Sequence, residues 1–598
     1  MNSRTVYDVL ALAAENYGNA IALHQPLGKG KYKTYSWVEY RDAAREIALG
    51  LRAIGIRKGD IVALHSETRA EFYLADHGIL TSGAIAAALY TSYPIHELVK
   101  NLRASDAKAV FAEDPKSMRS LLQAAGGESF HMQWILLEGQ AEGALTLDQL
   151  RERGRELLAS DPEAFTRMHA EVKPEDYAIL YLTSGATGEP KMGFVTHSAL
   201  IANVDMGPYA LPLGPGDATI AFLPSAHIAQ RVVLEFLPIG MGAPVWFSES
   251  LARLPNELKT IRPTFLLAPP RVWERIFASI STEIKKRPGY ARKLFFWAVG
   301  LGSEAARLRA EGKTLPAWMT AGLKVADRLV FSKIRQRLGG RLRIAASGAA
   351  PLGKELAGFY QAIGMPLIEG YGLTEGGVTC LNPIASPRPG SIGKALPGIE
   401  LRLAPDGELL IKGATLFSGY YKDPEATAAV LRDGWLYTGD IAEIDADGYV
   451  YITGRKKELI VSTNGKKIYP ARIEGLFKTE PLINQILLIG DRLPFVTALV
   501  TVNTANAETL KGMEGFHGRE PYEIAVAPPV VTEIQNAVSR VNKQLAPFEQ
   551  IRKFRVLERD FTIEQGELTP TMKVRRSKVL ENHKDTVNEL YMGKEEMQ

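Results

Sequence analysis

The segment "YLTSGATGEPKMGFVTH" (Tyr181–His197) joins an apolar run to a loop that is rich in glycine, serine and threonine and ends in a lysine. Backbone N–H groups of such a loop can surround an anion, and the hydroxyl groups and lysine add donors and positive charge. The usual P-loop has lysine directly after glycine and Ser/Thr directly after the lysine. Here Pro190 precedes Lys191 and Met192 follows it, so the loop is either an anion-binding loop of another kind or an ordinary turn.

Helical and strand patterns alternate on both sides of this loop, from about residue 35 to 250. The stretch "YRDAAREIALGLRAIGI" is typical of an amphipathic helix, and "DIVALHS" is typical of a buried strand. This alternation predicts a largely parallel sheet that is covered by helices. A chain of 598 residues is too long for one hydrophobic core, so we expect two or more domains.

Later regions differ in pattern and indicate the domain organisation. Residues 271–340 are helical, basic and aromatic, strands shorten and turns increase between about 395 and 452, and "TGRKKELI" is turn-like and charged. We therefore expect an α/β fold in which residues 1–454 form a large domain with parallel α/β sheets, a helical insert and a β-rich subdomain. Residues 455–598 form a small α+β C-terminal domain after a hinge.

The basic insert allows two interpretations. It is either a solvated helical hairpin that covers the sheet, or a basic face beside Phe295, Phe296 and Trp297 that contacts an anionic membrane surface. Insertion through a bilayer is not indicated, because no window holds the roughly 18 unbroken apolar residues that a span requires. The N-terminal segment is typical of a helix capped at Ser3 or Thr5 rather than of a signal peptide.

Composition limits the class of protein further. An apolar fraction of 46% and a charged fraction of 23% are ordinary for a globular protein. The net charge of +4 gives no indication of nucleic-acid binding. The single cysteine, Cys380, excludes an intramolecular disulfide and a thiolate metal cluster. We expect a cytoplasmic protein, at most peripheral on the inner face of a membrane.

Further polar stretches carry candidate binding groups. In "LIEGYGLTEGG", Tyr371, Thr374 and Glu375 follow an apolar strand and could contact a base, a phosphate and a metal respectively. The carboxylate of Asp440, in "GWLYTGDIAEID", could accept both hydroxyl groups of a ribose. "YITGRKKELIVSTNGKKIYP" is rich in basic residues, and "GELTPTMKVRRSKV" places Lys573 after a proline-containing loop. Each stretch alone is more often a surface feature than a site.

Together and in this order, these stretches resemble the adenylate-forming superfamily of acyl-CoA synthetases, luciferases and peptide-synthetase adenylation domains. The similarity covers roughly Tyr7 to Leu580 and rests on at least five ordered motifs. "LPSAHIAQR" (Leu223–Arg231), "PPRVWERI" (Pro269–Ile276) and the helical insert are most similar to the long-chain fatty acyl-CoA synthetases. The resemblance implies that a long-chain fatty acid is activated with ATP and Mg²⁺ and is transferred to CoA.

The chemistry of that reaction agrees with the residues. A carboxylate oxygen is a poor leaving group, so attack on the α-phosphate of ATP first gives an acyl-adenylate and pyrophosphate. The thiol of CoA then displaces AMP. Because the first step brings anions together, we expect charge neutralisation and positioning to dominate catalysis. Mg²⁺ prefers oxygen ligands such as the carboxylate of Glu375.

The resemblance also implies residue roles. Lys573 would stabilise charge on the α-phosphate and carboxylate, Thr374 would contact the α-phosphate, and Glu375 would hold Mg²⁺. The β- and γ-phosphates would be held by Thr183, Ser184, Gly185, Thr187, Gly188 and Lys191. The adenosine would be held by Gly348, Ala349, Ala350, Pro351, Tyr371, Asp440 and Arg455.

Two lysines relate to movement in this family, whose small domain rotates between the half-reactions. Lys457 matches the hinge, and the loop of Lys466 would replace Lys573 at the site during thioester formation. His227 either is a neutral imidazole in a tunnel wall or contacts the acyl carboxylate.

The family's loop usually reads TSGTTG followed by PKG, and two residues depart from it: Ala186 replaces threonine, and Met192 replaces glycine. A lost hydrogen bond to a charged phosphate costs about 1.5–3 kcal/mol, so we expect an active but slower enzyme. Met192 either stiffens the loop, or Gly193 forms the same turn one residue later. The alternatives are a fatty acyl-AMP ligase that delivers to a carrier protein, and a catalytically weak paralogue that binds nucleotide or acyl chains.

Overall fold

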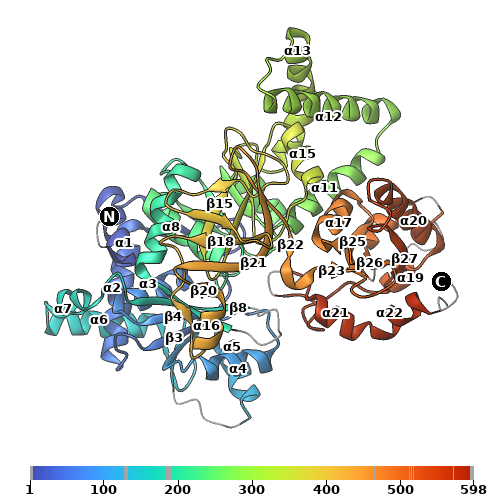
Figure 1. The fold of residues 1–598 in the computed structure, drawn as a ribbon. Coiled ribbons are helices and arrows are strands. Elements are labelled where there is room, and N and C mark those ends of the chain that lie inside the picture. Colours follow the sequence, from blue (N-terminus) through green and yellow to red (C-terminus); the bar gives the residue numbers. More distant parts are fainter. Residues whose placement is uncertain are drawn as a thin grey trace.

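The computed structural model describes residues 4–126, 132–183, 191–462, 465–510, 512–513, 515, 518–569 and 572–592. Its N-terminal part contains two large sheets and a smaller β-rich sheet, and its C-terminal domain has a sheet of its own (Figure 1). The pattern of alternating helices and strands predicted an α/β fold, and the structure confirms that class. The strands are divided between two sheets rather than placed in one, because an alternating pattern does not specify which strands belong to the same sheet.

The first sheet has eight strands in the order β19-β9-β8-β4-β3-β5-β6-β7. It is parallel from β8 to β7, and β9 and β19 are antiparallel. Every residue of β3 and β5 is buried, as expected for parallel strands that are covered on both faces. The bounds are β3 (Ile61–His65), β4 (Ile85–Ala88), β5 (Ala109–Ala112), β6 (Gln133–Leu136), β7 (Ala144–Thr146), β8 (Tyr177–Thr183), β9 (Lys191–Thr196) and β19 (Gly419–Tyr420).

The second sheet has nine strands in the order β16-β15-β14-β13-β12-β10-β11-β1-β2. It is parallel from β14 to β1 and antiparallel at both edges. The bounds are β1 (Ile21–Pro26), β2 (Tyr32–Ser36), β10 (Thr219–Ala221), β11 (Val245–Phe247), β12 (Phe265–Ala268), β13 (Ile344–Ser347), β14 (Leu367–Leu373), β15 (Gly377–Leu381) and β16 (Lys394–Ala395).

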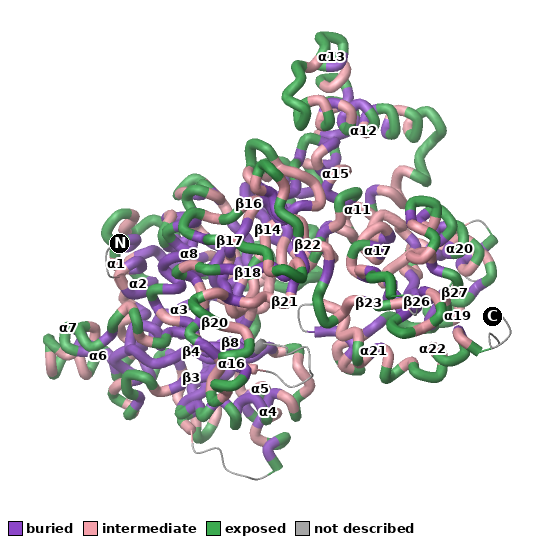
Figure 2. Tube along the Cα trace, viewed as in Figure 1, coloured by how far each residue is buried: buried purple, intermediate pink, exposed green. Residues whose placement is uncertain are grey.

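Helices cover both sheets, and the two sheets share a hydrophobic core that includes Val62 of β3 and Phe265 of β12 (Figure 2). The first helix begins after Thr5, whose hydroxyl accepts from the Asp8 N–H, so Thr5 is the predicted cap. The helices of this part are α1 (Val6–Tyr17), α2 (Trp37–Ala53), α3 (Ala70–Ser82), α4 (Ile95–Ala104), α5 (Pro115–Ala124), α6 (Leu147–Ser160), α7 (Ala164–Glu171), α8 (His197–Ala210), the π-helix η1 (Gln230–Phe236), α9 (Leu237–Met241), α10 (Leu254–Ile261) and α15 (Lys354–Ala362).

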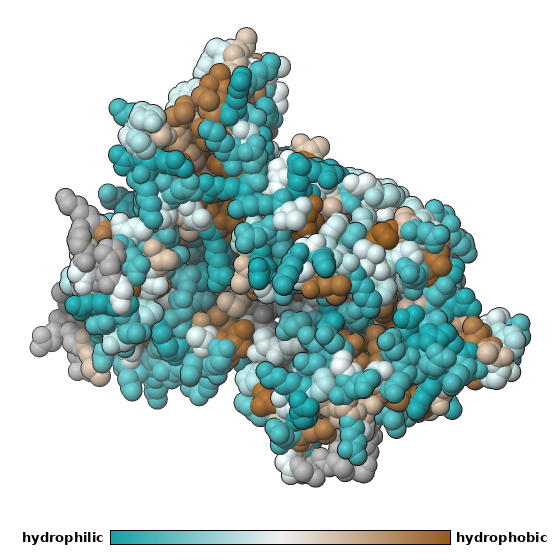
Figure 3. All heavy atoms as spheres, turned by 180° about the vertical axis from the view of Figure 1, so that it is seen from behind, coloured by the Kyte–Doolittle hydropathy of each residue, from teal (hydrophilic) through white to brown (hydrophobic). Residues whose placement is uncertain are grey.

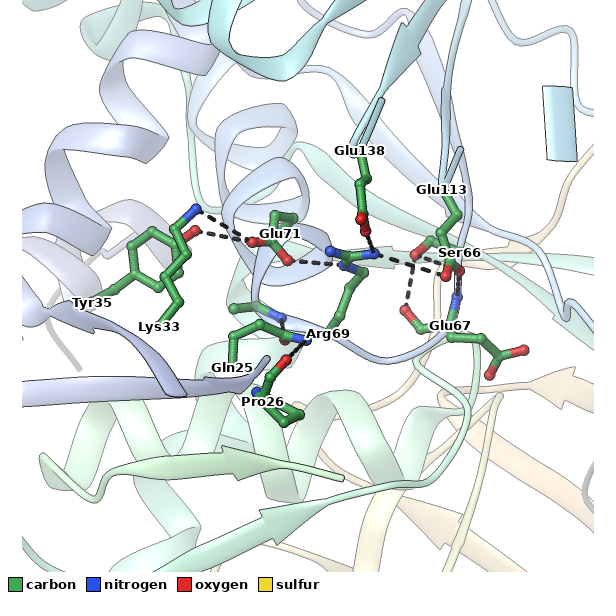
Figure 4. Close-up of polar contacts among 11 residues, drawn as sticks. Gln25, Pro26, Lys33, Tyr35, Ser66, Glu67, Arg69, Glu71, Glu113 and Glu138 are labelled. Atoms are coloured by element: carbon green, nitrogen blue, oxygen red, sulfur yellow. Dashed lines mark hydrogen bonds and ion pairs between the residues drawn. The ribbon is translucent and has the colours of Figure 1, made fainter. Parts of the chain in front are cut away.

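A polar network fixes the two sheets to each other at the start of α3 (Figure 4). Arg69, the residue before α3, donates to Glu71 and to Glu138, each at 2.8 Å. Glu138 follows β6 of the first sheet, while Tyr35, in β2 of the second sheet, donates to Glu71 at 3.0 Å. Because Glu71 is buried, these bonds compensate its loss of hydration.

The β-rich subdomain is a five-stranded antiparallel sheet, as its short strands and frequent turns indicate. Its strands are β17 (Glu400–Leu403), β18 (Glu408–Lys412), β20 (Leu431–Arg432), β21 (Trp435–Ile444) and β22 (Val450–Arg455), with α16 (Pro424–Val430) beside them.

The helical insert differs from one of its two interpretations, a hairpin that covers the sheet. Its first helix packs into the core through Trp273 and Ile280, but α12 and α13 project from the body (Figure 1). Helix α12 is fixed at its base by close contact with α15, since a Cβ on Gly302 would lie 2.1 Å from the Ala362 oxygen. The elements are α11 (Pro270–Lys285), α12 (Gly289–Ala310), α13 (Ala317–Ala326), η2 (Asp327–Phe331) and α14 (Ser332–Gln336).

The C-terminal domain has a separate core around Phe477, Val500 and Ile534. A short helix, η3 (Lys456–Glu458), connects it to β22. Its elements are β23 (Ile460–Val461), β24 (Lys467–Ile468), α17 (Pro470–Leu476), η4 (Phe477–Thr479), β25 (Ile483–Ile489), β26 (Val496–Val502), α18 (Thr504–Ala507), α19 (Pro521–Ala525), α20 (Pro528–Asn542), β27 (Ile551–Val556), α21 (Arg576–Asn582) and α22 (Lys584–Tyr591).

Candidate active site

A cavity of about 2250 Å³ lies between the second sheet, the β-rich subdomain and the C-terminal domain. Most of the site residues that the sequence predicts line this one cavity, although they come from distant parts of the chain. They are Lys191, His227, Gly348, Ala349, Ala350, Pro351, Tyr371, Thr374, Glu375, Asp440, Arg455, Lys457 and Lys573.

The predicted phosphate-binding loop is described only at its two ends. Ser184, Gly185, Ala186, Thr187 and Gly188 lie outside the described residues. The backbone of Thr183, the last residue of β8, pairs with that of Lys191, the first residue of β9.

Lys191 and Glu375 are connected by a tyrosine that sequence analysis did not identify. The Tyr420 hydroxyl donates to Oε1 of Glu375 at 2.7 Å, and Nζ of Lys191 lies 4.9 Å from the centre of the Tyr420 ring. Burial and the Glu375 carboxylate raise the pKa of Tyr420, so the hydroxyl keeps its proton. Tyr420 reaches this position because β19 pairs with β9, opposite Gly193.

Met192 is a strand residue rather than a loop residue. It pairs with Leu182 across β8 and β9, and its side chain is buried in a core with Leu180 and Leu182. The following Gly193 is confined, because a Cβ there would lie 3.1 Å from the Phe417 ring. The unusual methionine therefore contributes to packing of the first sheet.

The predicted ribose site is an ordered hydrogen-bonded group. Asp440 in β21 lies opposite Arg455 in β22, and Nε of Arg455 is 3.0 Å from Oδ1 of Asp440. The Tyr371 hydroxyl donates to Oδ2 at 2.5 Å. The Asp440 carboxylate raises the pKa of Arg455, which stays cationic. Both carboxylate oxygens thus have fixed positions at the cavity.

The predicted adenine wall, Gly348–Pro351, follows β13 and contains Ala349 at φ +71°. Its end is fixed by Glu369, whose Oε1 accepts from the Leu352 N–H at 2.9 Å. Burial raises the pKa of Glu369 to about 7, although the Leu352 N–H acts in the opposite direction. Glu369 lies just before the "GYGLTE" motif, and sequence analysis did not assign it a role.

Lys573 lies in a short hairpin, opposite Thr569. Thr569 N–H donates to the Lys573 carbonyl at 2.8 Å, and Lys573 N–H donates to the Thr569 hydroxyl at 3.0 Å. Burial and the charge of Arg455 together lower the pKa of the Lys573 amine to about 8, although Asp440 and Glu375 act in the opposite direction. The ammonium is thus close enough to Arg455, Asp440 and Glu375 for their charges to act on it.

His227 is neutral in this environment. Burial lowers its pKa to about 3, with a further contribution from the Lys573 charge. The Ala229 N–H donates to Nδ1 at 3.2 Å, which leaves the imidazole proton on Nε2. His227 is therefore a neutral donor between Lys573 and the apolar part of the cavity.

That apolar part is formed largely by α8 and η1, including Leu211, Val232 and Val233. Arg231 lies on the same π-helix and is fully buried, where it forms an ion pair with Asp76 of α3. The cavity is therefore lined by both charged and apolar side chains, and the π-helix that supplies Val232 and Val233 is held by the buried ion pair of Arg231 and Asp76.

The two lysines that the resemblance relates to movement lie in different surroundings. Lys457, in η3, lines the cavity between the two domains. Lys466 is not among the cavity-lining residues, and its Nζ lies 4.4 Å from the centre of the Phe548 ring. Lys573, not Lys466, faces the site in this structure.

A cavity that combines apolar residues with the side chains of Tyr371, Asp440, Arg455 and Lys573 is what the resemblance to adenylate-forming enzymes predicts. Residues 10–421 match the family of AMP-binding enzymes, and residues 457–595 match the C-terminal domain of AMP-binding enzymes. The chain belongs to this family, in the branch close to the fatty acyl-CoA synthetases.

Two curated relatives cover nearly the whole chain. The long-chain-fatty-acid–CoA ligase FadD15 of Mycobacterium bovis is 34% identical over 575 residues, which is 95% of this chain and 94% of the relative. The fatty acyl-CoA synthetase A of Dictyostelium discoideum is 30% identical over 625 residues, covering 98% and 90% respectively.

Solved structures confirm the fold. The adenylation domain of a carboxylate reductase from Mycobacterium chelonae has a TM-score of 0.76 at 22% identity, covering 99% of this chain and 92% of that one. The anthranilate CoA ligase AuaEII, in complex with anthranoyl-AMP, has a TM-score of 0.74 at 21% identity and covers 98% of each chain.

Proposed function

We propose that this protein is a long-chain fatty acid–CoA ligase that forms AMP. It activates a fatty acid with ATP as an acyl-adenylate and then transfers the acyl group to CoA, releasing pyrophosphate and AMP. One observation carries the proposal: Lys573, Asp440 and Arg455 line the same cavity as the apolar residues of η1, and Lys573 is close enough to the other two for their charges to act on it. The names and coverage of the relatives support the same reaction.

The adenosine of ATP binds between the Gly348–Pro351 loop and Tyr371. Asp440 accepts hydrogen bonds from the ribose hydroxyls, and Arg455 and Tyr371 keep its two oxygens in place. Thr374 contacts the α-phosphate, while Lys191 and the loop of Thr183, Ser184, Gly185, Thr187 and Gly188 bind the β- and γ-phosphates. Preorganised donors of this kind stabilise developing charge without further rearrangement.

Mg²⁺ fits the carboxylate that faces this cavity. Glu375 presents oxygen ligands there, and one oxygen is oriented by Tyr420. Mg²⁺ commonly binds one or two carboxylates together with substrate phosphates, rather than a cage made by the protein alone. When bound, the ion neutralises phosphate charge, and the protein's part is to hold Glu375 in position.

Lys573 and His227 act on the reacting groups of the first step. The fatty acid carboxylate attacks the α-phosphorus, the bond to pyrophosphate breaks, and pyrophosphate leaves. The Lys573 ammonium lies near both anions and offsets their repulsion, and Nε2–H of His227 donates to the carboxylate. The acyl chain lies along Val232 and Val233.

In the second step the thiol sulfur of CoA attacks the acyl carbon, and AMP leaves with its phosphate oxygen. We place the hinge at Lys457 and the boundary between the domains after Gly454, so that residues 455–598 rotate as a unit. Rotation would remove Lys573 from the site and bring the Lys466 loop to it. Of the two departures that suggest a catalytically weak paralogue, Met192 is a buried residue of β9 and takes no place among the polar groups that the reaction needs, which disfavours that alternative.

The test is release of pyrophosphate and AMP from ATP, measured with fatty acids from acetate to oleate, with and without CoA. The proposal predicts repeated turnover that requires CoA and is fastest with long chains. One pyrophosphate per enzyme, with or without CoA, would instead indicate delivery of the acyl group to a carrier protein. No release with any acid would contradict a ligase altogether.

We also propose that the helical insert contacts an anionic membrane surface. Residues 271–340 contain 15 lysines and arginines but five aspartates and glutamates, a net charge of +10 in a chain whose total is +4. On the projecting helices Tyr290 is 77% exposed, Phe296 65% and Trp318 66%. Hydrophobic groups lie among hydrophilic ones on this projection (Figure 3).

This combination favours a lipid surface, because aromatic side chains enter the interface while basic side chains attract anionic headgroups. No described helix is long and apolar enough to cross a membrane. We expect binding to vesicles that contain phosphatidylserine, weaker binding at high salt, and loss of binding in a Phe296→Ala, Trp318→Ala double variant. Equal binding to neutral vesicles, or none to either kind, would contradict the proposal.

A further inference from the structure

Two basic residues connect the C-terminal domain to helix α11 and to the adenine wall. Lys478, in η4, donates to the Pro351 carbonyl and lies 3.2 Å from Oε1 of Glu274 in α11. From the opposite side, Arg271 of α11 donates to the backbone carbonyl of Asn484 and, at 2.8 Å, to its side-chain oxygen. Arg271 also donates to Glu274 at 3.1 Å. Lys478, Glu274, Arg271 and Asn484 are thus connected in one polar group between the two domains.

Glu274 makes this group sensitive to the position of the C-terminal domain. Its side chain is largely buried, which raises its pKa, but Lys478 and Arg271 more than compensate and the carboxyl stays ionised. Rotation of the domain would remove Lys478 and leave Glu274 with Arg271 alone. A carboxylate that loses a partner in a poorly hydrated place loses stabilisation, so these contacts favour the present orientation.

The present orientation is the one that brings Lys573 to the cavity. Lys478 contacts the same loop, Gly348–Pro351, that we assign to adenine. Within the N-terminal domain, the same loop is fixed at its end by the hydrogen bond from the Leu352 N–H to Glu369. Adenine binding and the position of the C-terminal domain therefore act on one short segment of backbone.

We propose that Lys478, together with Glu274 and the Pro351 carbonyl, is a latch that holds the C-terminal domain in the orientation for adenylation and opens before thioester formation. The inference rests on the proposed ligase function. Lys478 is a positioning residue, since it contacts the adenine wall and α11 rather than the reacting atoms.

The latch predicts unequal effects on the two half-reactions. In Lys478→Met, the first turnover of pyrophosphate from ATP and fatty acid should slow about tenfold, as for loss of one charge-assisted contact. Release of AMP from supplied acyl-adenylate and CoA should be unchanged or faster. Glu274→Gln should act in the same direction, and Lys478→Arg should restore most of the first rate.

Arg555→Gln is a matched control, because Arg555 pairs with Glu589 within the C-terminal domain, at 2.8 Å. It should leave both half-reactions at the wild-type rates. An equal decrease of both rates in Lys478→Met would indicate general damage and overturn the latch. Unchanged rates in Lys478→Met would overturn it as well.

A second measurement separates this inference from the proposed function. Cys380 is buried, so fluorophores can be attached to cysteines introduced at the exposed residues Glu425 and Glu558, one in each domain. Lys478→Met should change energy transfer between them, whether or not the protein makes acyl-CoA. Identical transfer with and without the variant would overturn the latch, even if the ligase activity is found.

Discussion

The bond between Tyr420 and Glu375 gives the sharpest test of the site. Tyr420→Phe removes the hydroxyl that donates to Glu375 at 2.7 Å but keeps the ring beside Lys191. The variant should therefore disturb the carboxylate that we propose binds Mg²⁺, without changing the packing of β19.

The size of the effect follows from the kind of bond. A hydrogen bond to a charged group contributes about 1.5–3 kcal/mol, and loss of a residue that orients a metal ligand reduces metal affinity or activity about 10–100-fold. Because Tyr420 and Glu375 are partly exposed at the cavity, we expect the lower end of that range. Adenylation should slow about tenfold at low Mg²⁺ and recover as Mg²⁺ is increased.

The assay is pyrophosphate release as a function of Mg²⁺ concentration at saturating ATP and fatty acid. Tyr421→Phe is a matched control, since the Tyr421 hydroxyl donates to the exposed Asp106. The reasoning is refuted if Tyr420→Phe has the Mg²⁺ dependence of the wild type, or if Tyr421→Phe shifts it equally.

Three further predictions concern charge. The Lys573 amine has a pKa of about 8 and its cation is the active form, so kcat/KM for ATP should fall as pH rises through about 8. Lys573→Met should abolish this fall and slow adenylation at least about 100-fold. The same variant should still release AMP from supplied acyl-adenylate when CoA is added. Asp440→Asn should raise the KM for ATP about tenfold by weakening the ribose contact, and an unchanged KM in steady-state kinetics would contradict that role. Burial raises the pKa of Glu369 to about 7, so the folded protein binds this proton more tightly than the unfolded chain does. The free energy of unfolding should therefore fall by about 3 kcal/mol as pH rises from the pKa of the unfolded state to 7. Glu369→Gln should remove this loss, so its gain in Tm over the wild type should be larger at pH 8 than at pH 5.

Local features of the fold could be predicted from the sequence. The Thr5 cap, the buried strand Ile61–His65 and the short strands of the β-rich subdomain depend on neighbouring residues, and all are present. Ordered motifs also predicted site residues such as Asp440 and Lys573, and the structure brings these two to one cavity.

Long-range features were not accessible in this way. Tyr420 lies in an unremarkable "SGYYKD" stretch, and it becomes part of the site through the pairing of β19 with β9. Assignment of strands to two sheets and the projection of α12 and α13 likewise depend on tertiary packing. Met192 looked like a defect in a loop, but its burial in a strand is a matter of sheet packing.

The ion pair of Arg231 and Asp76 limits how the cavity surface that we propose for the acyl chain can be redesigned. Arg231 and Asp76 are both fully buried, and breaking a buried pair by removing one partner costs about 3–5 kcal/mol. The π-helix that carries Arg231 therefore has little freedom to shift and make room for a longer chain. Changes of side-chain volume at Val232 or Val233, which face the cavity, offer the route to new chain lengths that leaves this anchor intact.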